Sequence, residues 1–351
     1  MKFNFKNIYI TGGDGWLGRV LINTLINGDD DVLENFLTVN YNIHSLDVKN
    51  SNFDNNSKNR EINHFVGDIR FKNDCKKFLK NCKNEILIHC AGIIHPNKVS
   101  DFYSINLKGT QNLINSAIKN GIKKIIVISS NSPIGCNKSN QLLFDEESIY
   151  NPYMNYGKSK KLVEEFLLKK IKKGIDITII RPPWFYGENM PERQLIFYKL
   201  IKQGRFPIIG NGNNIRSKVN VKNIVQAILL AAMKKKSKGQ IYWIADEKPY
   251  TMNEIIGTVR DVLEEEFKIK CKNSNLFLPY FVGQIFQCSD YILQSFGIYN
   301  QKIHIASELN KNIGCSIKKA KIELDYNPKI SLYDGIKNSL LNIDLKKYFN
   351  D

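Results

Sequence analysis

The stretch TGGDGWLG (residues 11–18) decides the fold, because an apolar run precedes it and an amphipathic run, residues 19–27, follows it. Gly13, Gly15 and Gly18 match the pattern G-x-G-x-x-G between a strand and a helix. Glycines at these positions let the backbone approach a pyrophosphate, and the N-terminus of the helix supplies N–H donors and a positive dipole. The stretch therefore predicts a strand, a turn and a helix that bind a dinucleotide.

Apolar runs and helical runs then alternate along the chain. We expect strands at residues 43–47, 62–68, 86–92, 124–129 and 176–181, and helices at residues 74–81, 106–119 and 158–172. The run at residues 124–129 is almost continuous in Ile and Val, which is typical of a parallel strand covered on both faces. The predicted fold class is α/β, a Rossmann doubly wound parallel sheet with a smaller, mostly helical C-terminal domain.

The pattern changes after residue 181, where prolines interrupt the chain at positions 182, 183, 191 and 207. We expect residues 1–181 to form the Rossmann domain, rejoined by a strand at residues 241–246. Residues 182–240 and 265–351 would form the smaller domain, which would bind the substrate.

Asp47 ends the second predicted strand, 29 residues after Gly18. An acid at this position hydrogen-bonds the 2′-hydroxyl of a ribose and repels a 2′-phosphate, which favours NAD over NADP. The alternative interpretation is an ordinary Asp that ends a strand.

Tyr156 and Lys160 lie four residues apart in a helical run, so both side chains would lie on one face. A phenol has an unperturbed pKa of about 10, and a fixed ammonium nearby favours the phenolate. The pair is therefore a candidate general base that takes a proton from an alcohol. The alternative interpretation is a solvated helix N-terminus, because Tyr-x-x-x-Lys occurs by chance in a chain rich in both residues.

The net charge is +17, but the lysines are spread along the whole sequence. This favours a charge that serves solubility over one that binds nucleic acid. Seven cysteines occur without a Cys-x-x-Cys pair, and no His pair has metal-ligand spacing, so we expect neither disulfides nor a metal site. We also see no signal peptide and no apolar run near the ~18 residues of a membrane span. We expect a cytoplasmic protein without stable membrane insertion.

Six motifs, in order, resemble those of the extended short-chain dehydrogenase/reductases. This group holds nucleotide-sugar epimerases and dehydratases and 3β-hydroxysteroid dehydrogenases. The motifs are the glycine stretch, GDIR (residues 67–70), HCAG (residues 89–92), NLKGT (residues 106–110), Ser130, and the pair Tyr156 and Lys160. The resemblance covers nearly the whole chain and is specific for fold and cofactor.

The resemblance implies NAD as the cofactor and a Ser-Tyr-Lys triad as the catalytic group. Tyr156 would take the proton of a secondary alcohol. Lys160 would lower the pKa of Tyr156 and bind the nicotinamide ribose, and Ser130 would hydrogen-bond the substrate oxygen. The residues expected to contact NAD are Gly12, Gly13, Gly15, Trp16, Leu17, Gly18, Asp47, Asp68, Ile69, Cys90, Ala91, Gly92, Asn106, Tyr156 and Lys160. Because the family often pairs the helix after Asn106 with the Tyr156 helix, a homodimer is expected.

Residues around the triad bear on the substrate. Asn131 and Ser132 stand where 4,6-dehydratases carry the Asp and Glu that eliminate water, which argues against a dehydratase. Arg216 stands where sugar-nucleotide enzymes pair an Arg with the diphosphate, and it could bind that group bidentately. The alternative is a surface Arg in a loop. The stretch RPPWFYGE (residues 181–188) resembles the hydroxysteroid branch, because Trp184 stands where many sugar epimerases have an Asn.

These observations favour an NAD-dependent epimerase or dehydrogenase that acts on a secondary alcohol of a nucleotide-activated sugar, a small molecule. A 3β-hydroxysteroid-type dehydrogenase on an apolar ring alcohol is the alternative. A catalytically silent NAD-binding protein is a third hypothesis, which the presence of both Tyr156 and Lys160 disfavours. The segment at residues 276–296 is rich in aromatic residues, and we expect it to pack in the core rather than to form a cradle for a lipid.

Overall fold

The computed structural model describes residues 5–34, 41–49, 62–139, 142–341 and 343–349. In this part of the chain, a parallel sheet joins seven strands in the order β11-β6-β5-β4-β1-β2-β3. The strands are β1 (Asn7–Thr11), β2 (Asn42–Asp47), β3 (Ile62–Val66), β4 (Ile86–His89), β5 (Lys124–Ile128), β6 (Ile177–Arg181) and β11 (Ile241–Trp243). They form where the apolar runs predict them, and the doubly wound α/β fold is confirmed.

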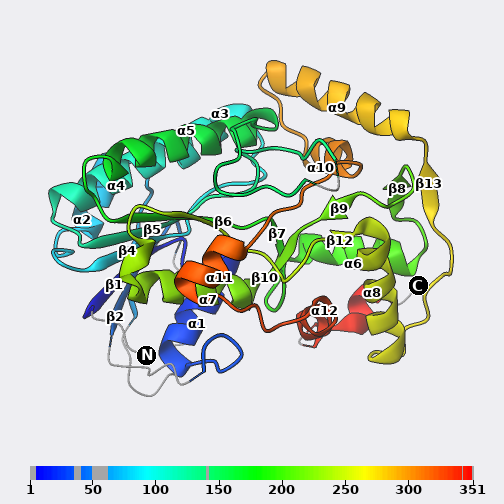
Figure 1. The fold of residues 1–351 in the computed structure, drawn as a ribbon, viewed down its shortest axis with the longest axis horizontal. Coiled ribbons are helices and arrows are strands. Elements are labelled where there is room, and N and C mark those ends of the chain that lie inside the picture. Colours follow the sequence, from blue (N-terminus) through cyan, green and yellow to red (C-terminus); the bar gives the residue numbers. More distant parts are fainter. Residues whose placement is uncertain (1–4, 35–40, 50–61, 140–141, 342, 350–351) are drawn as a thin grey trace.

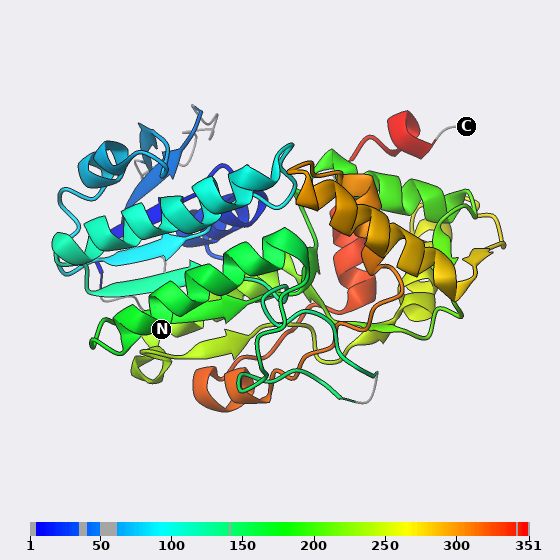
Figure 2. The ribbon, with the colours of Figure 1, turned by 90° about the horizontal axis from the view of Figure 1, so that it is seen from above.

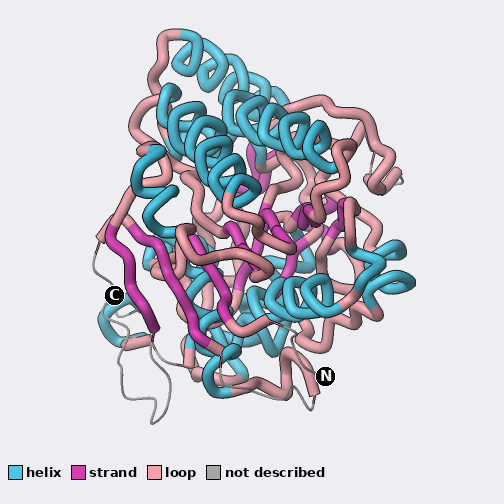
Figure 3. Tube along the Cα trace, turned by 90° about the vertical axis from the view of Figure 1, so that its left-hand side faces the viewer, coloured by secondary structure: helices cyan, strands magenta, loops and turns pink. Residues whose placement is uncertain are grey.

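Helices cover both faces of this sheet, as Figure 1 and Figure 3 show. One face carries α1 (Trp16–Asn27), α7 (Val221–Met233) and α11 (Lys318–Leu324). The other face carries α2 (Lys72–Phe78), α4 (Thr110–Lys119) and α5 (Met154–Ile171). A short helix, α3 (Val99–Asp101), and a π-helical segment, η1 (Phe102–Gly109), lead directly into α4.

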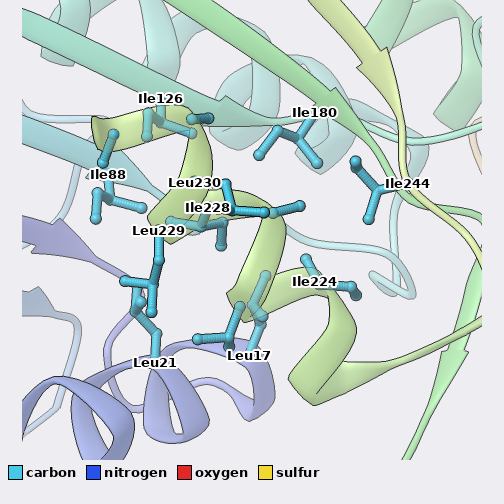
Figure 4. Close-up of a cluster of buried hydrophobic side chains, with 14 of the residues drawn as sticks. Leu17, Leu21, Ile88, Ile126, Ile180, Ile224, Ile228, Leu229, Leu230 and Ile244 are labelled. Atoms are coloured by element: carbon cyan, nitrogen blue, oxygen red, sulfur yellow. The ribbon is translucent and has the colours of Figure 1, made fainter. Parts of the chain in front are cut away.

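The larger core lies between the sheet, α1 and α7 (Figure 4). Leu21 of α1, Ile126 of β5 and Ile228 of α7 are fully buried in this cluster. Burying one side chain of this size stabilises the fold by about 1.5–3 kcal/mol. The cluster therefore holds α1, and with it the glycine turn before α1, firmly against the sheet.

A second core lies beyond the end of β6. Its helices are α6 (Leu195–Lys202), α8 (Met252–Glu265), α12 (Leu332–Leu340) and α13 (Leu345–Phe349). Short strands pair around it: β7 (Trp184–Tyr186) with β10 (Lys218–Asn220), β8 (Pro207–Ile209) with β13 (Leu276–Leu278), and β9 (Ile215–Arg216) with β12 (Tyr250–Thr251). Helices α9 (Tyr280–Ser295) and α10 (Gln301–Glu308) pack on each other, and α9 contacts the first turn of α5.

The two cores divide the chain differently from the expected ranges. Helix α7 falls within residues 182–240, yet it packs in the cluster on the sheet, because its almost continuous apolar sequence needs cover on several sides. Helix α8 lies between the expected ranges, yet it contributes Ile255 and Val259 to the second core. We therefore propose a Rossmann domain that includes α7 and α11, and a substrate domain that includes α8.

The aromatic segment at residues 276–296 lies at the surface, so the expectation that it packs in the core is wrong. Phe277, Phe281 and Phe296 are 55%, 58% and 79% exposed. Helix α9 instead buries Asp290 and Gln294 against the protein. The hydrogen bonds of these polar side chains decide which side of the helix faces inward.

A buried ion pair fastens α5 to the sheet. Arg181 Nη2, at the end of β6, lies 2.6 Å from Glu164 Oε2 of α5, and both side chains are almost completely buried. The hydroxyls of Ser129 and Tyr150 also donate to this carboxylate. A buried charge is tolerated when it is paired and hydrogen-bonded in this way.

We expect Glu164→Ala to lower the free energy of unfolding by about 3–5 kcal/mol, because Arg181 would keep a buried charge without its partner. Glu165→Ala is the matched control. The Glu165 side chain is 41% exposed and pairs with Lys161 across one helical turn, so its loss should be less than about 1 kcal/mol. Urea unfolding followed by circular dichroism measures both. Equal losses would show that the buried pair contributes nothing special.

Candidate active site

The carboxyl ends of β1, β4 and β5 meet at one edge of the sheet, where ligands bind in doubly wound folds. A Cβ added to Gly12 would lie 2.8 Å from the backbone of Ala91, so the turn after β1 touches the loop after β4. Lys160 Nζ donates a hydrogen bond of 3.1 Å to the carbonyl of Ile128, at the end of β5. The glycine turn and the Tyr156 helix thus face the same edge.

The glycine turn has no room for side chains. Gly12 has a φ of +74°. A Cβ added to Gly13 would lie 2.1 Å from Ser45 Oγ, and one added to Gly18 would lie 2.1 Å from the carbonyl oxygen of Gly12. Gly15 precedes α1 and offers no side-chain cap to its first N–H groups. These donors and the helix dipole fit a pyrophosphate, so the turn fits the NAD that the sequence implies.

Trp16 and Leu17 begin α1 and would therefore lie nearest to such a phosphate. Leu17 is buried in the core. The indole of Trp16 donates to the carbonyl of Glu188 (2.6 Å) and lies 4.8 Å, centroid to centroid, from the ring of Phe185. Trp16 thus connects the glycine turn to the segment that follows β6.

Asp47 ends β2 beside the glycine turn. Its Oδ1 accepts the N–H of Asp14 (2.9 Å), and its Oδ2 accepts the hydroxyl of Ser45 (2.6 Å). A carboxylate has about four acceptor sites, so two hydrogen bonds leave capacity for a ribose. The geometry fits the role that the sequence suggests.

Asp68 and Ile69 follow β3, on the adenine side of the expected site. Arg70 donates hydrogen bonds to both carboxylate oxygens of Asp68. Its backbone N–H donates to Oδ1 (2.8 Å), and its Nη2 donates to Oδ2 (2.6 Å). Ile69 is buried. A Cβ added to Gly109 would lie 2.6 Å from Ile69, so η1 packs closely on this loop.

Asn106 holds the loop that contains Cys90, Ala91 and Gly92. Its side-chain amide accepts the N–H of Ile93 (2.8 Å) and donates to the carbonyl of the same residue (2.9 Å). A Cβ added to Gly92 would lie 3.2 Å from Asn106 Oδ1 and 3.7 Å from Lys160 Nζ. The loop therefore runs between Asn106 and Lys160.

Ser130 and Tyr156 lie near each other, and the Ser130 hydroxyl lowers the pKa of Tyr156 against the larger effect of burial. Ser130 follows β5, and Tyr156 lies in the first turn of α5, where its ring packs 5.6 Å from that of Phe102. Gly157 permits this approach, because a Cβ there would lie 2.5 Å from the carbonyl oxygen of Ser132. The structure thus brings Ser130, Tyr156 and Lys160 to one edge.

The pKa values of Tyr156 and Lys160 differ from the expectation that Lys160 lowers the pKa of Tyr156. Burial raises the pKa of Tyr156 to about 12, although the hydroxyl of Ser130 opposes this shift. Burial lowers the pKa of Lys160 to about 8, against the nearby charge of Glu164. A lowering of the Tyr156 pKa by Lys160 is not seen in the protein alone. Burial is the largest influence on the pKa of Tyr156, and the ammonium of Lys160 is hydrogen-bonded to the Ile128 carbonyl instead.

Arg216 is buried, unlike an ordinary loop arginine. Its Nη1 donates to the main-chain carbonyl of Glu308 (3.0 Å), and its Nη2 lies 3.7 Å from Glu308 Oε2. The charge of Glu308 also raises the pKa of Tyr156, so this carboxylate lies near Tyr156 as well as beside Arg216. The sequence carried no signal for Glu308, because it lies 92 residues from Arg216.

Lys218 is a second residue that sequence reasoning missed. Its Nζ lies 3.5 Å from the centroid of the Trp184 ring. Burial lowers the pKa of Lys218 to about 7, while the charge of Asp246 opposes the shift. The face of an aromatic ring stabilises a desolvated ammonium, so Trp184 compensates part of the lost hydration.

Within the described part of the chain, no group of His, Cys, Asp and Glu residues could hold a metal ion. No helix among the same residues is long and apolar enough to cross a bilayer. All seven cysteines are free thiols.

Residues 9–272 match the 3-beta hydroxysteroid dehydrogenase/isomerase family. The chain is 42% identical over 344 residues to "uncharacterized protein y4nL" of Sinorhizobium fredii. The alignment covers 97% of this chain and 96% of that protein. It is 29% identical to the N-acetyl-alpha-D-glucosaminyl-diphospho-ditrans,octacis-undecaprenol 4-epimerase of Escherichia coli O157:H7, with 80% and 77% of the two chains covered.

The fold is similar to that of UDP-glucuronic acid 4-epimerase from Bacillus cereus, whose structure contains NAD. The TM-score is 0.71 at 21% identity, over 95% of this chain and 97% of that one. The family match spans most of this chain, and the fold and the glycine turn agree with it. The chain is therefore an enzyme of the 3-beta hydroxysteroid dehydrogenase/isomerase family, within the extended short-chain dehydrogenase/reductases.

Proposed function

We propose that the protein is an NAD-dependent epimerase that acts on a secondary alcohol of a diphosphate-linked sugar, such as a nucleotide-activated sugar. The observation that carries this proposal is the meeting of Ser130, Tyr156 and Lys160 beside the glycine turn. The E. coli relative supports it, since its name describes 4-epimerisation of a sugar on a diphosphate carrier.

Tyr156 would exchange the proton of the reacting hydroxyl. With a pKa of about 12, it holds its proton at neutral pH, which suits donation to a ketone oxygen. For the oxidation, Lys160 would leave the Ile128 carbonyl and stabilise the phenolate that takes the hydroxyl proton. Ser130 would hydrogen-bond the substrate oxygen as charge develops. The glycine turn and Asp47 would hold NAD, which supplies a hydride acceptor and donor for the carbon that bears the reacting hydroxyl.

The residues after Ser130 support epimerisation over dehydration. Ser130 Oγ lies 3.3 Å from Asn131 Oδ1 and 3.3 Å from Ser132 Oγ. Neither neighbour is an acid or base that titrates near neutral pH, so neither could readily protonate a leaving hydroxyl. The ketone would therefore keep its neighbouring hydroxyl group.

Arg216 supports a diphosphate. A guanidinium forms paired hydrogen bonds with phosphate oxygens, and burial strengthens such bonds by excluding water. Arg216 is held by a carbonyl and by a carboxylate oxygen 3.7 Å away. A phosphate could replace this long contact with Glu308.

A 3β-hydroxysteroid-type dehydrogenase is the second candidate. The ring of Trp184 in β7 lies 5.2 Å from that of Phe197 in α6, in an edge-on arrangement at the second core. An apolar wall of this kind would favour a fused-ring alcohol.

The reaction is tested with UDP-N-acetylglucosamine and a panel of 3β-hydroxysterols. We expect the purified protein to release NAD on gentle denaturation, because an epimerase recycles its cofactor in place. We expect proton NMR to show inversion at one sugar carbon without net NADH formation. Steady NADH formation with a sterol, and none of this inversion, would replace the proposal with the second candidate.

Tyr156→Phe should lower the turnover at least about 100-fold, because it removes the group that exchanges the proton. NAD binding should survive, since the ring and its contact with Phe102 remain. Tyr153→Phe is the matched control in the same helix start, because its hydroxyl bonds Ser307 instead. Turnover and calorimetric NAD titration measure the two effects. Unchanged turnover in Tyr156→Phe would remove Tyr156 from the mechanism.

Asp47→Asn should weaken NAD binding by roughly tenfold or more, because a hydrogen bond to a charged group is lost. Binding of NADP should weaken less or improve, since the repulsion of its 2′-phosphate falls. Calorimetric titration of both cofactors gives the ratio of the two affinities. An unchanged ratio would place the ribose-binding acid elsewhere in the chain.

A further inference from the structure

The polarity of helix α9 is reversed relative to an ordinary surface helix. Its inward side carries Asp290 and Gln294, which are almost completely buried. Asp290 Oδ2 lies 2.7 Å from His304 Nδ1. Gln294 accepts the N–H of Asn155 (3.1 Å) and donates to Asp290 (2.8 Å). The polar residues of the helix are thus used to hold it in place.

The outward side of α9 is mostly apolar, although Gln284 and Ser295 are also exposed there. Large exposed side chains follow the helical repeat at Tyr280, Phe281, Ile285, Tyr291 and Ile292. Exposed residues in the flanking segments extend the surface, namely Leu276, Phe277, Phe296 and Ile298. Contiguous exposed apolar surface of this kind marks an interaction site. We call these nine residues the α9 face.

The α9 face lacks charge in a strongly charged chain. Charged residues make up 24% of the protein, yet residues 276–301 contain only Asp290, which faces inward. Exposed cations stand at the ends of the face. The backbone of Lys98 forms a β-bridge with Ile298, and Lys302 is the second residue of α10. Arg205 lies two residues before Pro207, the β8 residue that pairs with Leu276.

Helix α9 also lies next to the proposed active site. Its Gln294 holds Asn155, which directly precedes Tyr156. Tyr299, just after the helix, belongs to the buried cluster of Tyr156 and Phe102. Figure 1 shows α9 along the upper edge of the molecule with α10 beneath it, and Figure 2 shows both over the substrate-domain helices.

We propose that the α9 face lies in the surface of an anionic lipid bilayer, and that the enzyme takes its diphosphate-linked sugar from a lipid carrier there. Interfacial helices bury an apolar face about 5–10 Å into the boundary between headgroups and acyl chains. The net charge of +17 and the cations at both ends of the face match an anionic surface. The choice of lipid-linked sugar rests on the proposed function, whereas the membrane contact does not.

A second copy of this chain is the competing occupant of the face. Charge favours the bilayer, because an apolar contact between two copies would gain nothing from the exposed cations at the ends of the face. An anionic bilayer instead gains from every lysine and arginine near its surface.

The membrane contact is tested by sedimentation of the full chain with vesicles. We expect binding to vesicles of phosphatidylcholine with phosphatidylglycerol, and weaker binding to phosphatidylcholine alone or in high salt. The double variant Phe281→Glu/Ile285→Glu should lose at least about tenfold in binding, because both apolar contacts become charged. Ile149→Glu and Ile322→Glu are controls, since these residues are exposed but lie outside the face.

The variants should keep their melting temperature and their turnover of a soluble UDP-sugar, because Phe281 and Ile285 are exposed. A protein that does not bind anionic vesicles would overturn the proposal. So would a concentration-dependent dimer, abolished by the double variant, in place of vesicle binding. Vesicle binding without conversion of any diphosphate-linked sugar would instead reject the substrate and keep the membrane contact.

Discussion

The buried carboxylate of Glu164 connects the elements that make the site. It receives hydrogen bonds from Ser129, just after β5, and from Arg181, at the end of β6. Glu164 follows Lys160 by one turn of α5, so this fastening also sets the position of Lys160 and Tyr156. Its charge favours the protonated amine of Lys160 against burial. One group thus positions the ammonium and helps to keep it charged.

Close backbone approach is the second requirement of the site. Gly12 and Gly18 let α1 start directly at the edge of the sheet, and Gly157 lets α5 approach the loop of Ser130. Side chains at these positions would separate the triad from the glycine turn. The geometry of the candidate site therefore depends on residues that contribute no functional group of their own.

The C-terminal helices link the triad to the outer surface. Glu308 of α10 connects Arg216 with the surroundings of Tyr156, and Asp290 of α9 binds His304 of α10. Because the polar side chains of α9 are used for these inward contacts, its apolar side chains face outward. Positioning of the site and exposure of an apolar face are two consequences of one arrangement.

The sequence by itself determined the Rossmann fold, the glycine turn and the spacing that brings Ser130, Tyr156 and Lys160 together. These signals are local, since a strand, a turn and a helical repeat each lie within a short stretch. Only the tertiary structure decided that α7 covers the sheet, that Arg216 is buried and that α9 turns its apolar side outward. Those outcomes depend on contacts between distant residues, such as Arg216 with Glu308 and Asn155 with Gln294, 139 residues apart. Residue patterns show which side of a helix is apolar, but only its partners decide which side is buried.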